Sequence, residues 1–160
     1  MSLYYYNSKM SPIGLWGPEI WNFFHTMAEK IKEDDFITLG PQLFYHIKRI
    51  CSHLPCPACS EHAKRFFKNA PPNAFSTKKG LKEGLFVFHN VVNRRKQKPI
   101  QSLELLDQYK THNVVRAYER FIRVYKTRGN MKLLTDSFQR QMIITDLKRW
   151  LLKNLKSFEH

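Results

Sequence analysis

The chain has 160 residues, and 42% of them are hydrophobic, so it is long and apolar enough to bury the core of one domain. Its formal net charge is +14, but the basic residues are spread along the chain, which argues against a dedicated nucleic-acid-binding protein. No apolar run reaches the ~20 residues of a membrane span, and the first residues lack the pattern of a signal peptide. We therefore expect a cytoplasmic protein. Because disulfides are rare in that compartment, the three cysteines do not indicate a scaffold held together by disulfides.

The N-terminal half contains three predicted helices. Apolar residues at helical spacing predict a first helix over about 18–32, with Pro18 in its first turn. The stretch EDDFITLGP, residues 33–41, is expected to break the helical pattern. A second helix is predicted over 43–54, and a third is expected to begin at Cys56 and to run to the NAPPNA segment.

The C-terminal half also has helical periodicity. Ser76 is expected to cap a fourth helix that ends near Pro99, and residues 103–109 predict a short turn or helix. Gly129 is expected to end the helix after that. The last two helices have apolar stripes of Val114, Val115, Tyr118, Phe121, Ile122 and Tyr125, and of Phe138, Met142, Ile143, Leu147, Trp150, Leu151 and Leu155. Since no run alternates with period two, the predicted fold class is all-α, a four-helix bundle with a helical C-terminal extension.

The stretch SHLPCPACSEHAKRFF holds two of the three cysteines and has three possible interpretations. His53, Cys56, Cys59 and His62 have the composition of a Cys2His2 zinc set, but no distant second ligand pair accompanies them. As a redox pair, Cys56 would lie at a helix start, where the thiolate is favoured, with Cys59 within disulfide reach. Without a thioredoxin-like sheet, such a pair needs another electron acceptor, which indicates a cofactor. The third possibility is two small residues opening a helix.

The remaining cysteine, Cys51, shares the apolar stripe of the second predicted helix. We expect it to be a core residue, with an auxiliary or intermolecular thiol as the alternative.

Two further segments combine aromatic and polar residues at helical spacing. In FHNVVNRRKQKP, His89 and Asn93 lie on one helix face, and basic residues crowd the helix end. One interpretation is a core histidine with its hydrogen bonds made inside the protein, followed by basic residues in solvent. The other is the polar and aromatic wall, with cations at its end, that a dinucleotide cofactor with a pyrophosphate requires. In WGPEIWNFFH, Trp21 and His25 present stacked rings that suit either the core or a cofactor wall.

Together, WGPEIWNFFH, LPCPACSEHA and FHNVVNRRKQKP resemble the Erv/ALR family of flavin-linked sulfhydryl oxidases, above all the short forms of large DNA viruses. The resemblance spans residues 16–99. It implies a four-helix bundle that binds FAD, forms a homodimer, oxidises protein dithiols and passes electrons to O2 to give H2O2. It also implies an oxidase domain over residues 1–110 and a helical extension over 111–160. The alternative is a basic helical module that binds zinc or nucleic acid without catalysis.

Carried over residue by residue, the resemblance makes Cys56 and Cys59 the active disulfide. Cys59 would face the flavin, and Cys56 would exchange with the substrate thiol. No metal ligand is predicted. The predicted FAD-binding residues are Gly17, Trp21, His25, Phe88, His89, Asn90, Val92, Asn93, Arg94, Lys96 and Lys98.

The chain departs from the family pattern in its cysteines. Cys51 is the only other cysteine, so no structural pair and no shuttle pair are available, and substrate must reach Cys56 directly. We expect the electron donor to be a small dithiol protein, either thioredoxin-like or a short CxxxC relay. Tyr109 is the candidate for the family's tail aromatic near the flavin. The viral likeness implies a host-cytoplasmic protein, or one packaged in the virion.

Overall fold

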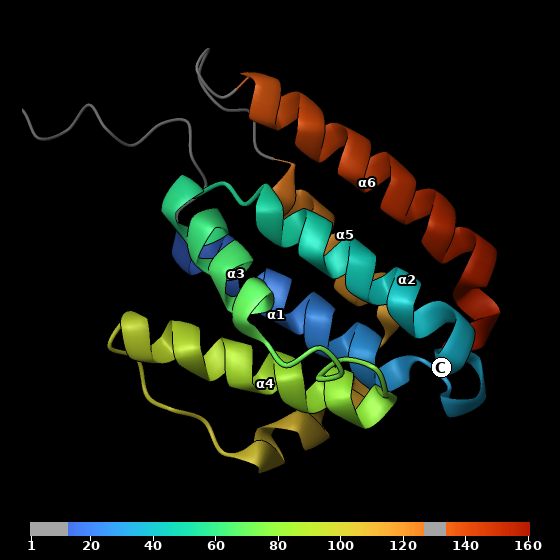
Figure 1. The fold of residues 1–160 in the computed structure, drawn as a ribbon. Helices are drawn as coiled ribbons and strands as arrows, with labels where there is room; N and C mark the ends of the chain where they lie inside the picture. The colour runs from blue at the N-terminus through green and yellow to red at the C-terminus, as the bar shows by residue number, and fades with distance from the viewer. Residues whose placement is uncertain (1–12, 127–133) are drawn as a thin grey trace, which may run out of the picture.

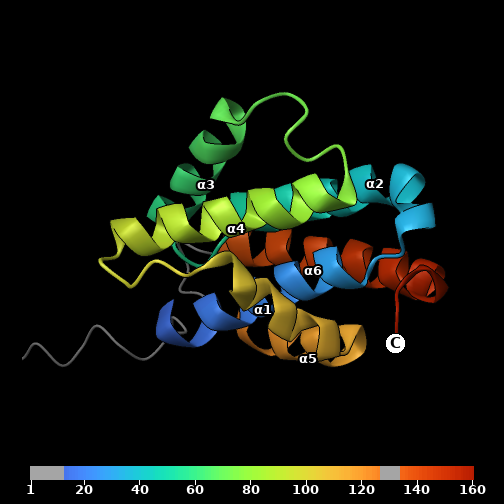
Figure 2. The same cartoon turned by 90° about the horizontal axis from the view of Figure 1, so that it is seen from below.

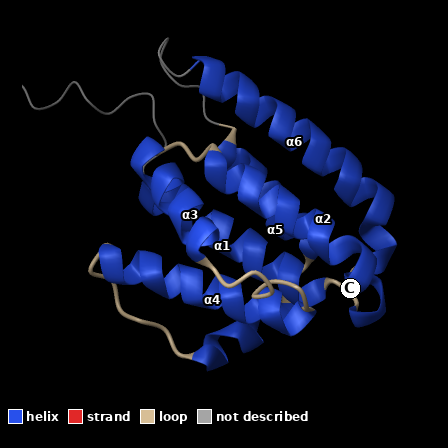
Figure 3. Ribbon diagram, in the orientation of Figure 1, coloured by secondary structure: helices blue, strands red, loops and turns tan. Residues whose placement is uncertain are grey.

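A computed structural model describes residues 13–126 and 134–160, and these ranges are almost entirely helical (Figure 3). In chain order the elements are α1 (Ile13–Lys30), α2 (Glu33–Ser52), α3 (Pro57–Asn69), α4 (Lys78–Arg95), the 3-10 helix η1 (Leu103–Thr111), α5 (Val114–Tyr125), α6 (Leu134–Asn154) and the 3-10 helix η3 (Leu155–Ser157). In the described ranges, extended pairing is limited to one bridge between Ile31 and Phe158, so the predicted all-α class is confirmed. No helix in this part of the chain is long and apolar enough to cross a membrane.

The core lies around α1 and α2. Helices α4 and α5 pack against α1, while α3 and α6 pack against α2 (Figures 1 and 2). Phe23, Phe24 and Met27 of α1 and Leu43 and Ile47 of α2 are each at most 1% exposed. Burial of such side chains contributes roughly 1.5–3 kcal/mol each to the stability of the bundle.

The C-terminal helices cover the sides of α1 and α2 that face away from α3. The ring of Phe121 on α5 stacks on that of Phe23, with centroids 4.7 Å apart. On α6, the Trp150 Nε1–H donates a hydrogen bond to Gln42 Oε1 at 2.8 Å. Residues after position 110 therefore add to the same hydrophobic core as the first four helices.

Two predictions about the first helices are wrong. Helix α1 already begins at Ile13. Pro18 has no N–H, so the helix loses the hydrogen bond to the Gly14 carbonyl, but Gly14 is exposed and water can take the place of that donor. The predicted break at 33–41 is instead the first half of α2. Three acidic residues in its first turn interact favourably with the helix dipole. Pro41 leaves the carbonyl of Ile37 without its helical hydrogen bond, but Ile37 is exposed and water can bind that carbonyl.

Smaller corrections apply further along. Thr77, not Ser76, caps α4: the Gly80 amide donates to Thr77 Oγ1 at 2.9 Å. The predicted C-terminal stripes are buried only in part, because each helix contacts the bundle along one side; the exposed members are Val115, Phe138 and Met142. Gly129 lies outside the described residues.

Candidate active site

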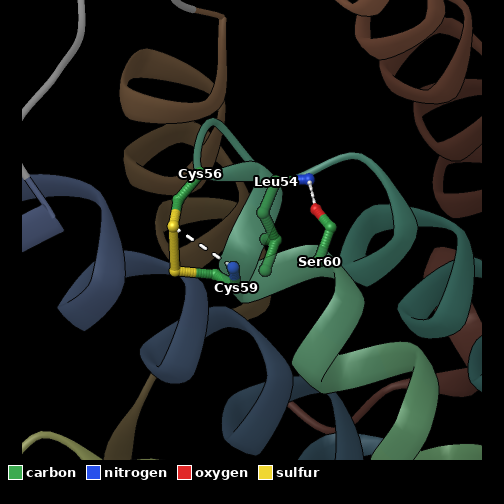
Figure 4. The surroundings of a disulfide bond; sticks show 4 residues. All are labelled: Leu54, Cys56, Cys59 and Ser60. Carbon is green, nitrogen blue, oxygen red and sulfur yellow. Dashed lines mark hydrogen bonds between the residues drawn. A yellow bond between two sulfur atoms is a disulfide. The ribbon is translucent and has the colours of Figure 1, made fainter.

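A disulfide joins Cys56 and Cys59 at the start of α3 (Figure 4). Cys56 is the N-cap residue: its Sγ accepts a hydrogen bond from the Cys59 amide at 3.2 Å, and Pro57 fills the first helical position. Free amides and the positive end of the helix dipole favour a thiolate at Cys56 once the pair is reduced. The predicted start of this helix is confirmed, and the two sulfurs are bonded as their spacing allows.

The corner between α2 and α3 holds the disulfide in place. The Leu54 amide donates to the Ser60 hydroxyl at 2.9 Å (Figure 4). The Ser60 amide donates to the Cys56 carbonyl at 3.1 Å. Ser60 is 5% exposed, so these bonds are protected from water. The backbone around the disulfide is therefore fixed before any substrate arrives.

The four residues of the zinc interpretation do not meet as ligands. His53 directs its Nδ1 to the Arg49 carbonyl at 3.2 Å, and the two thiols are bonded to each other. Over the described ranges, no three side chains among His, Cys, Asp and Glu are placed to hold a metal ion.

The disulfide borders a cavity of about 290 Å³ inside the bundle. Trp16, Trp21 and Phe88 supply its aromatic walls. Gly17 forms part of the floor: a Cβ there would meet nothing closer than Ile13 Cγ2, at 4.0 Å, so larger side chains would grow into the open space. The remaining lining residues are Ile13, Ile20, Phe24, Cys51, Leu54, Cys56, Ala58, Cys59, His62, Val92, Arg95 and Lys96.

The third cysteine lies in the core, as its place on the second apolar stripe predicts. Cys51 is 2% exposed, and burial raises the pKa of its thiol well above the usual range. Although it borders the cavity, the thiol stays protonated at neutral pH and is a poor nucleophile.

A pair of histidines, His25 buried and His89 half-buried, continues the aromatic wall from α1 to α4. His25 Nε2 and His89 Nδ1 are 3.1 Å apart, and Trp21 stacks on His89 with ring centroids 4.1 Å apart. Tyr109 of η1 stacks on the far side of His25 at 4.9 Å. The His25 Nδ1 atom is buried without a hydrogen-bond partner in the described structure.

Both histidines are neutral near pH 7. Burial and then the nearby His89 lower the pKa of His25 to about 3. Burial and then the charge of Lys98 lower the pKa of His89 to about 4. A neutral pair shares one proton in its hydrogen bond, so one ring donates and the other accepts.

The two asparagines of FHNVVN act on the chain that follows α4. Asn90 Oδ1 accepts from the Gln101 amide at 2.9 Å, and Asn90 Nδ2 donates to the Gln101 carbonyl at 3.0 Å. Asn93 is 7% exposed, and its backbone carbonyl accepts from the Lys98 amide at 2.8 Å. These bonds fold the segment carrying Lys98 back along α4 toward His89.

The basic residues at the end of α4 divide into two groups. Lys96 lines the cavity, and its Nζ lies 5.8 Å from the centre of the Trp16 ring. Arg95 also lines the cavity, whereas Arg94, which the sequence singled out, is exposed and does not. The difference follows from helical geometry, because Arg95 is three residues from Val92 and seven from Phe88, on the same face.

Several cavity residues were not predicted from the sequence, and Trp16, Arg95 and His62 are the most informative of them. Trp16 was overlooked because the first helix was expected to begin only at Pro18. Arg95 lay hidden in a run of basic residues. His62 was interpreted as a helix-surface residue, yet its position three residues after Cys59 places it in the cavity wall.

The fold and the site define an all-helical protein in which a CxxC disulfide at a helix start opens onto an aromatic cavity. Residues 18–116 match the Erv1/Alr family, and the chain belongs to that family. It is also similar to a protein of Invertebrate iridescent virus 6 that is named, provisionally, FAD-linked sulfhydryl oxidase 347L. The two are 35% identical over 94 residues, which cover 54% of this chain and 83% of the viral protein. No solved structure matches the chain significantly.

Proposed function

We propose that Cys56 and Cys59 are the redox-active pair of an FAD-dependent sulfhydryl oxidase, and that FAD binds in the cavity they border. Family membership and the relative's name support the activity itself: the chain is a thiol oxidase with FAD as cofactor, a dithiol as substrate and O2 as acceptor. One observation supports the assignment of residues above all others. The disulfide at the start of α3 forms part of the wall of the aromatic cavity.

The cavity residues suit the isoalloxazine part of FAD. The rings of Trp16, Trp21 and Phe88 offer apolar faces to a flat isoalloxazine, and Gly17 leaves space beside it. His25, whose buried Nδ1 has no partner in the described structure, lies behind Trp21 and does not itself line the cavity.

The cations beside the cavity fit the other end of the cofactor. Lys96 and Arg95 at the cavity, with Lys98 beside His89, would balance the pyrophosphate. The Asn90 side chain would serve mainly by holding the segment that carries Lys98, and the Asn93 side chain would support it through its contact with Asn90 Oδ1.

The thiol chemistry begins at Cys56. A substrate thiolate attacks Cys56 Sγ, the Cys56–Cys59 bond breaks, and Cys59 leaves as a thiolate. The second substrate thiol, once deprotonated, attacks the substrate sulfur of the mixed disulfide, so that a substrate disulfide forms and Cys56 leaves. Departure of Cys56 is eased by the Cys59 amide and the helix dipole, which stabilise its thiolate.

Electron balance requires an acceptor for the reduced pair. When bound, FAD accepts the two electrons of the Cys56–Cys59 dithiol and passes them to O2, so that R(SH)2 and O2 give a disulfide and H2O2. The apolar walls of the cavity would keep water away from the reactive sulfurs while this happens.

We extend the proposal to partners and organisation. The donor would be a dithiol protein, thioredoxin-like or a short CxxxC relay, because the buried Cys51 leaves the chain without a shuttle pair. A homodimer is supported by exposed apolar residues on α6, Phe138 at 66% and Met142 at 43%. Residues 1–110 would form the oxidase domain and 111–160 its extension. Residence in a host cytoplasm or virion rests on the likeness to a viral protein.

Oxygen uptake tests the assignment of the two cysteines. With dithiothreitol as substrate, Cys59→Ser is expected to lose at least about a hundredfold in rate, because the pair can no longer form. Cys51→Ala is the matched control for loss of a thiol, and because Cys51 borders the cavity its rate is compared per bound flavin, where it should equal that of the wild type. A Cys59→Ser variant that consumes oxygen as fast as the wild type would contradict the assignment, as would an equal loss in Cys51→Ala.

A further inference from the structure

A second hollow lies between α3 and α4, and the proposed flavin site does not use it. It is an apolar groove of about 490 Å³, with Phe66 and Phe75 on one wall and Val87 and Val91 on the other. Val87 is 51% exposed and Val91 is 36% exposed, which is unusual for neighbouring β-branched residues on a helix. Figure 2 shows why the groove is open: α3 leans away from α4 toward the loop that joins them.

The groove leads to the disulfide along α3. Cys59, His62, Phe66 and Asn69 follow one another at three- and four-residue spacing, so they share a face of the helix. His62 lines both the groove and the disulfide cavity. The Phe66 ring, in the groove, stacks on the Phe88 ring, in the cavity, with centroids 4.6 Å apart. One aromatic wall therefore separates the two hollows.

Helix α4 carries a matching stripe, which approaches the disulfide at the C-terminal end of the helix, whereas the stripe on α3 approaches it at the N-terminal end. Gly84, Val87, Val91 and Arg95 also follow one another at three- and four-residue spacing. The first three line the groove, and Arg95 lines the cavity. The apolar surface therefore ends in cations beside the disulfide.

The described residues that line the groove include a cation and no carboxylate. Arg65 lines it, and Arg94 and Arg95 lie at the adjoining end of α4. None of the three arginines forms an ion pair within the described ranges. An acidic partner would supply the missing counter-charges.

We propose that this groove docks the protein substrate, through an acidic segment that carries one apolar side chain close to its reactive cysteine. The inference rests on the proposed function, because it takes Cys56 as the sulfur that the substrate attacks. That attack forms the mixed disulfide with Cys56 and releases Cys59 as a thiolate, while the apolar side chain lies against Val87 and Val91.

Helix geometry sets the spacing within the substrate. Phe66 is ten residues beyond Cys56, which corresponds to about 15 Å along the helix axis. An extended chain covers about 3.3 Å per residue, so roughly four or five residues span that distance. The apolar side chain should therefore lie about four residues from the substrate cysteine.

Reduced synthetic peptides test the inference on the flavin-loaded protein. The first peptide has a Cys-x-x-Cys pair, a leucine four residues beyond it and acidic residues around the leucine. A second peptide replaces the leucine by serine, and a third replaces the acidic residues by lysine. The wild type should oxidise the first with a kcat/KM about tenfold higher than either of the others. Dithiothreitol has no segment to dock in the groove, so its turnover measures the redox steps alone.

Variants locate the effect. Val87→Lys should remove the preference for leucine, and Arg65→Glu should remove the preference for acidic residues, both with wild-type dithiothreitol turnover. Ile37→Lys, at an 84% exposed apolar position on α2, is the matched control and should retain both preferences.

The outcomes separate the docking inference from the proposed function. Equal oxidation of all three peptides by the wild type would overturn the docking site, as would unchanged preferences in Val87→Lys and Arg65→Glu. A change of molecular mass in Val87→Lys, measured by sedimentation, with unchanged peptide kinetics would assign the groove to a second copy and would also overturn it. Failure to oxidise even dithiothreitol would instead contradict the thiol-oxidase function.

Discussion

Helix α1 presents aromatic residues on two sides, and the two sides are packed differently. Toward α3 and α4, the rings of Trp16 and Trp21 line a cavity of about 290 Å³ next to the disulfide. Toward α5, Phe23 stacks directly on Phe121, and both rings are fully buried.

The difference shows how one helix serves both stability and chemistry. A filled aromatic interface stabilises the fold, while an open aromatic cavity costs packing energy that a bound ligand can recover. Helices α5 and α6 cover the outer sides of α1 and α2, and they add buried apolar area to a bundle whose disulfide end is hollow. We infer that the extension stabilises the fold and that the cavity is the reactive region.

The largest expected effect is at the packed interface between α1 and α5. Phe121→Ala should lower the free energy of unfolding by about 3–5 kcal/mol, because it removes a fully buried ring and leaves a void against Phe23. Urea denaturation measures this. Val115→Ala, at a 40% exposed position on the same helix, should change stability by less than about 0.5 kcal/mol. Equal effects of the two variants would show that α5 contributes little to the core.

A smaller effect is expected from acid at the histidine pair. The folded-state pKa of His25, about 3, lies below the model-peptide value of 6.5. The unfolded state therefore binds more protons below pH 6.5, and the free energy of unfolding should fall as pH falls from 6.5 toward 3. The slope should reach about 1.4 kcal/mol per pH unit from this residue.

Comparison with a variant isolates that contribution. His25→Phe should flatten the decline of stability between pH 6.5 and 4, whereas His160→Phe, at an exposed terminal position, should follow the wild type. Acid titration of the carboxylates, Asp146 among them, is common to all three proteins and cancels. Identical profiles for the wild type and His25→Phe would mean that His25 is not buried in its neutral form.

The third effect concerns the cavity between α1, α3 and α4 and is expected in the affinity for FAD. Gly17→Leu should weaken FAD binding by about tenfold or more, because its side chain would occupy the cavity. Its free energy of unfolding should change by no more than about 1 kcal/mol. Gly14→Leu on the same helix, where an added Cβ meets nothing within 4 Å, should bind FAD normally. Fluorescence titration with FAD distinguishes the two variants, and equal affinities would place the flavin elsewhere.

The sequence predicts local features of the site well. The start of α3 follows from the N-cap position of Cys56 and from Pro57, which are local rules of helix geometry. The aromatic stripe of Trp21 and His25 follows from four-residue spacing.

Features that depend on tertiary structure were predicted less well. The start of α1 was misplaced because Pro18 lies near the exposed N-terminal end of the helix, where a lost backbone hydrogen bond costs less than in a buried helix interior. The helix over 33–41 was overlooked because burial of Phe36 and Leu39 outweighs the weak propensity of that stretch. The groove could not have been predicted, since it depends on how α3 leans away from α4.

The central claim is that Cys56 and Cys59 exchange electrons with FAD bound beside them. Its most direct test is the visible absorption spectrum of the purified protein before and after a dithiol is added without oxygen. The account predicts a yellow protein whose flavin band is bleached by the dithiol in the wild type and not in Cys59→Ser. A folded protein that is colourless and does not retain added FAD would contradict the claim, as would bleaching of Cys59→Ser at the wild-type rate.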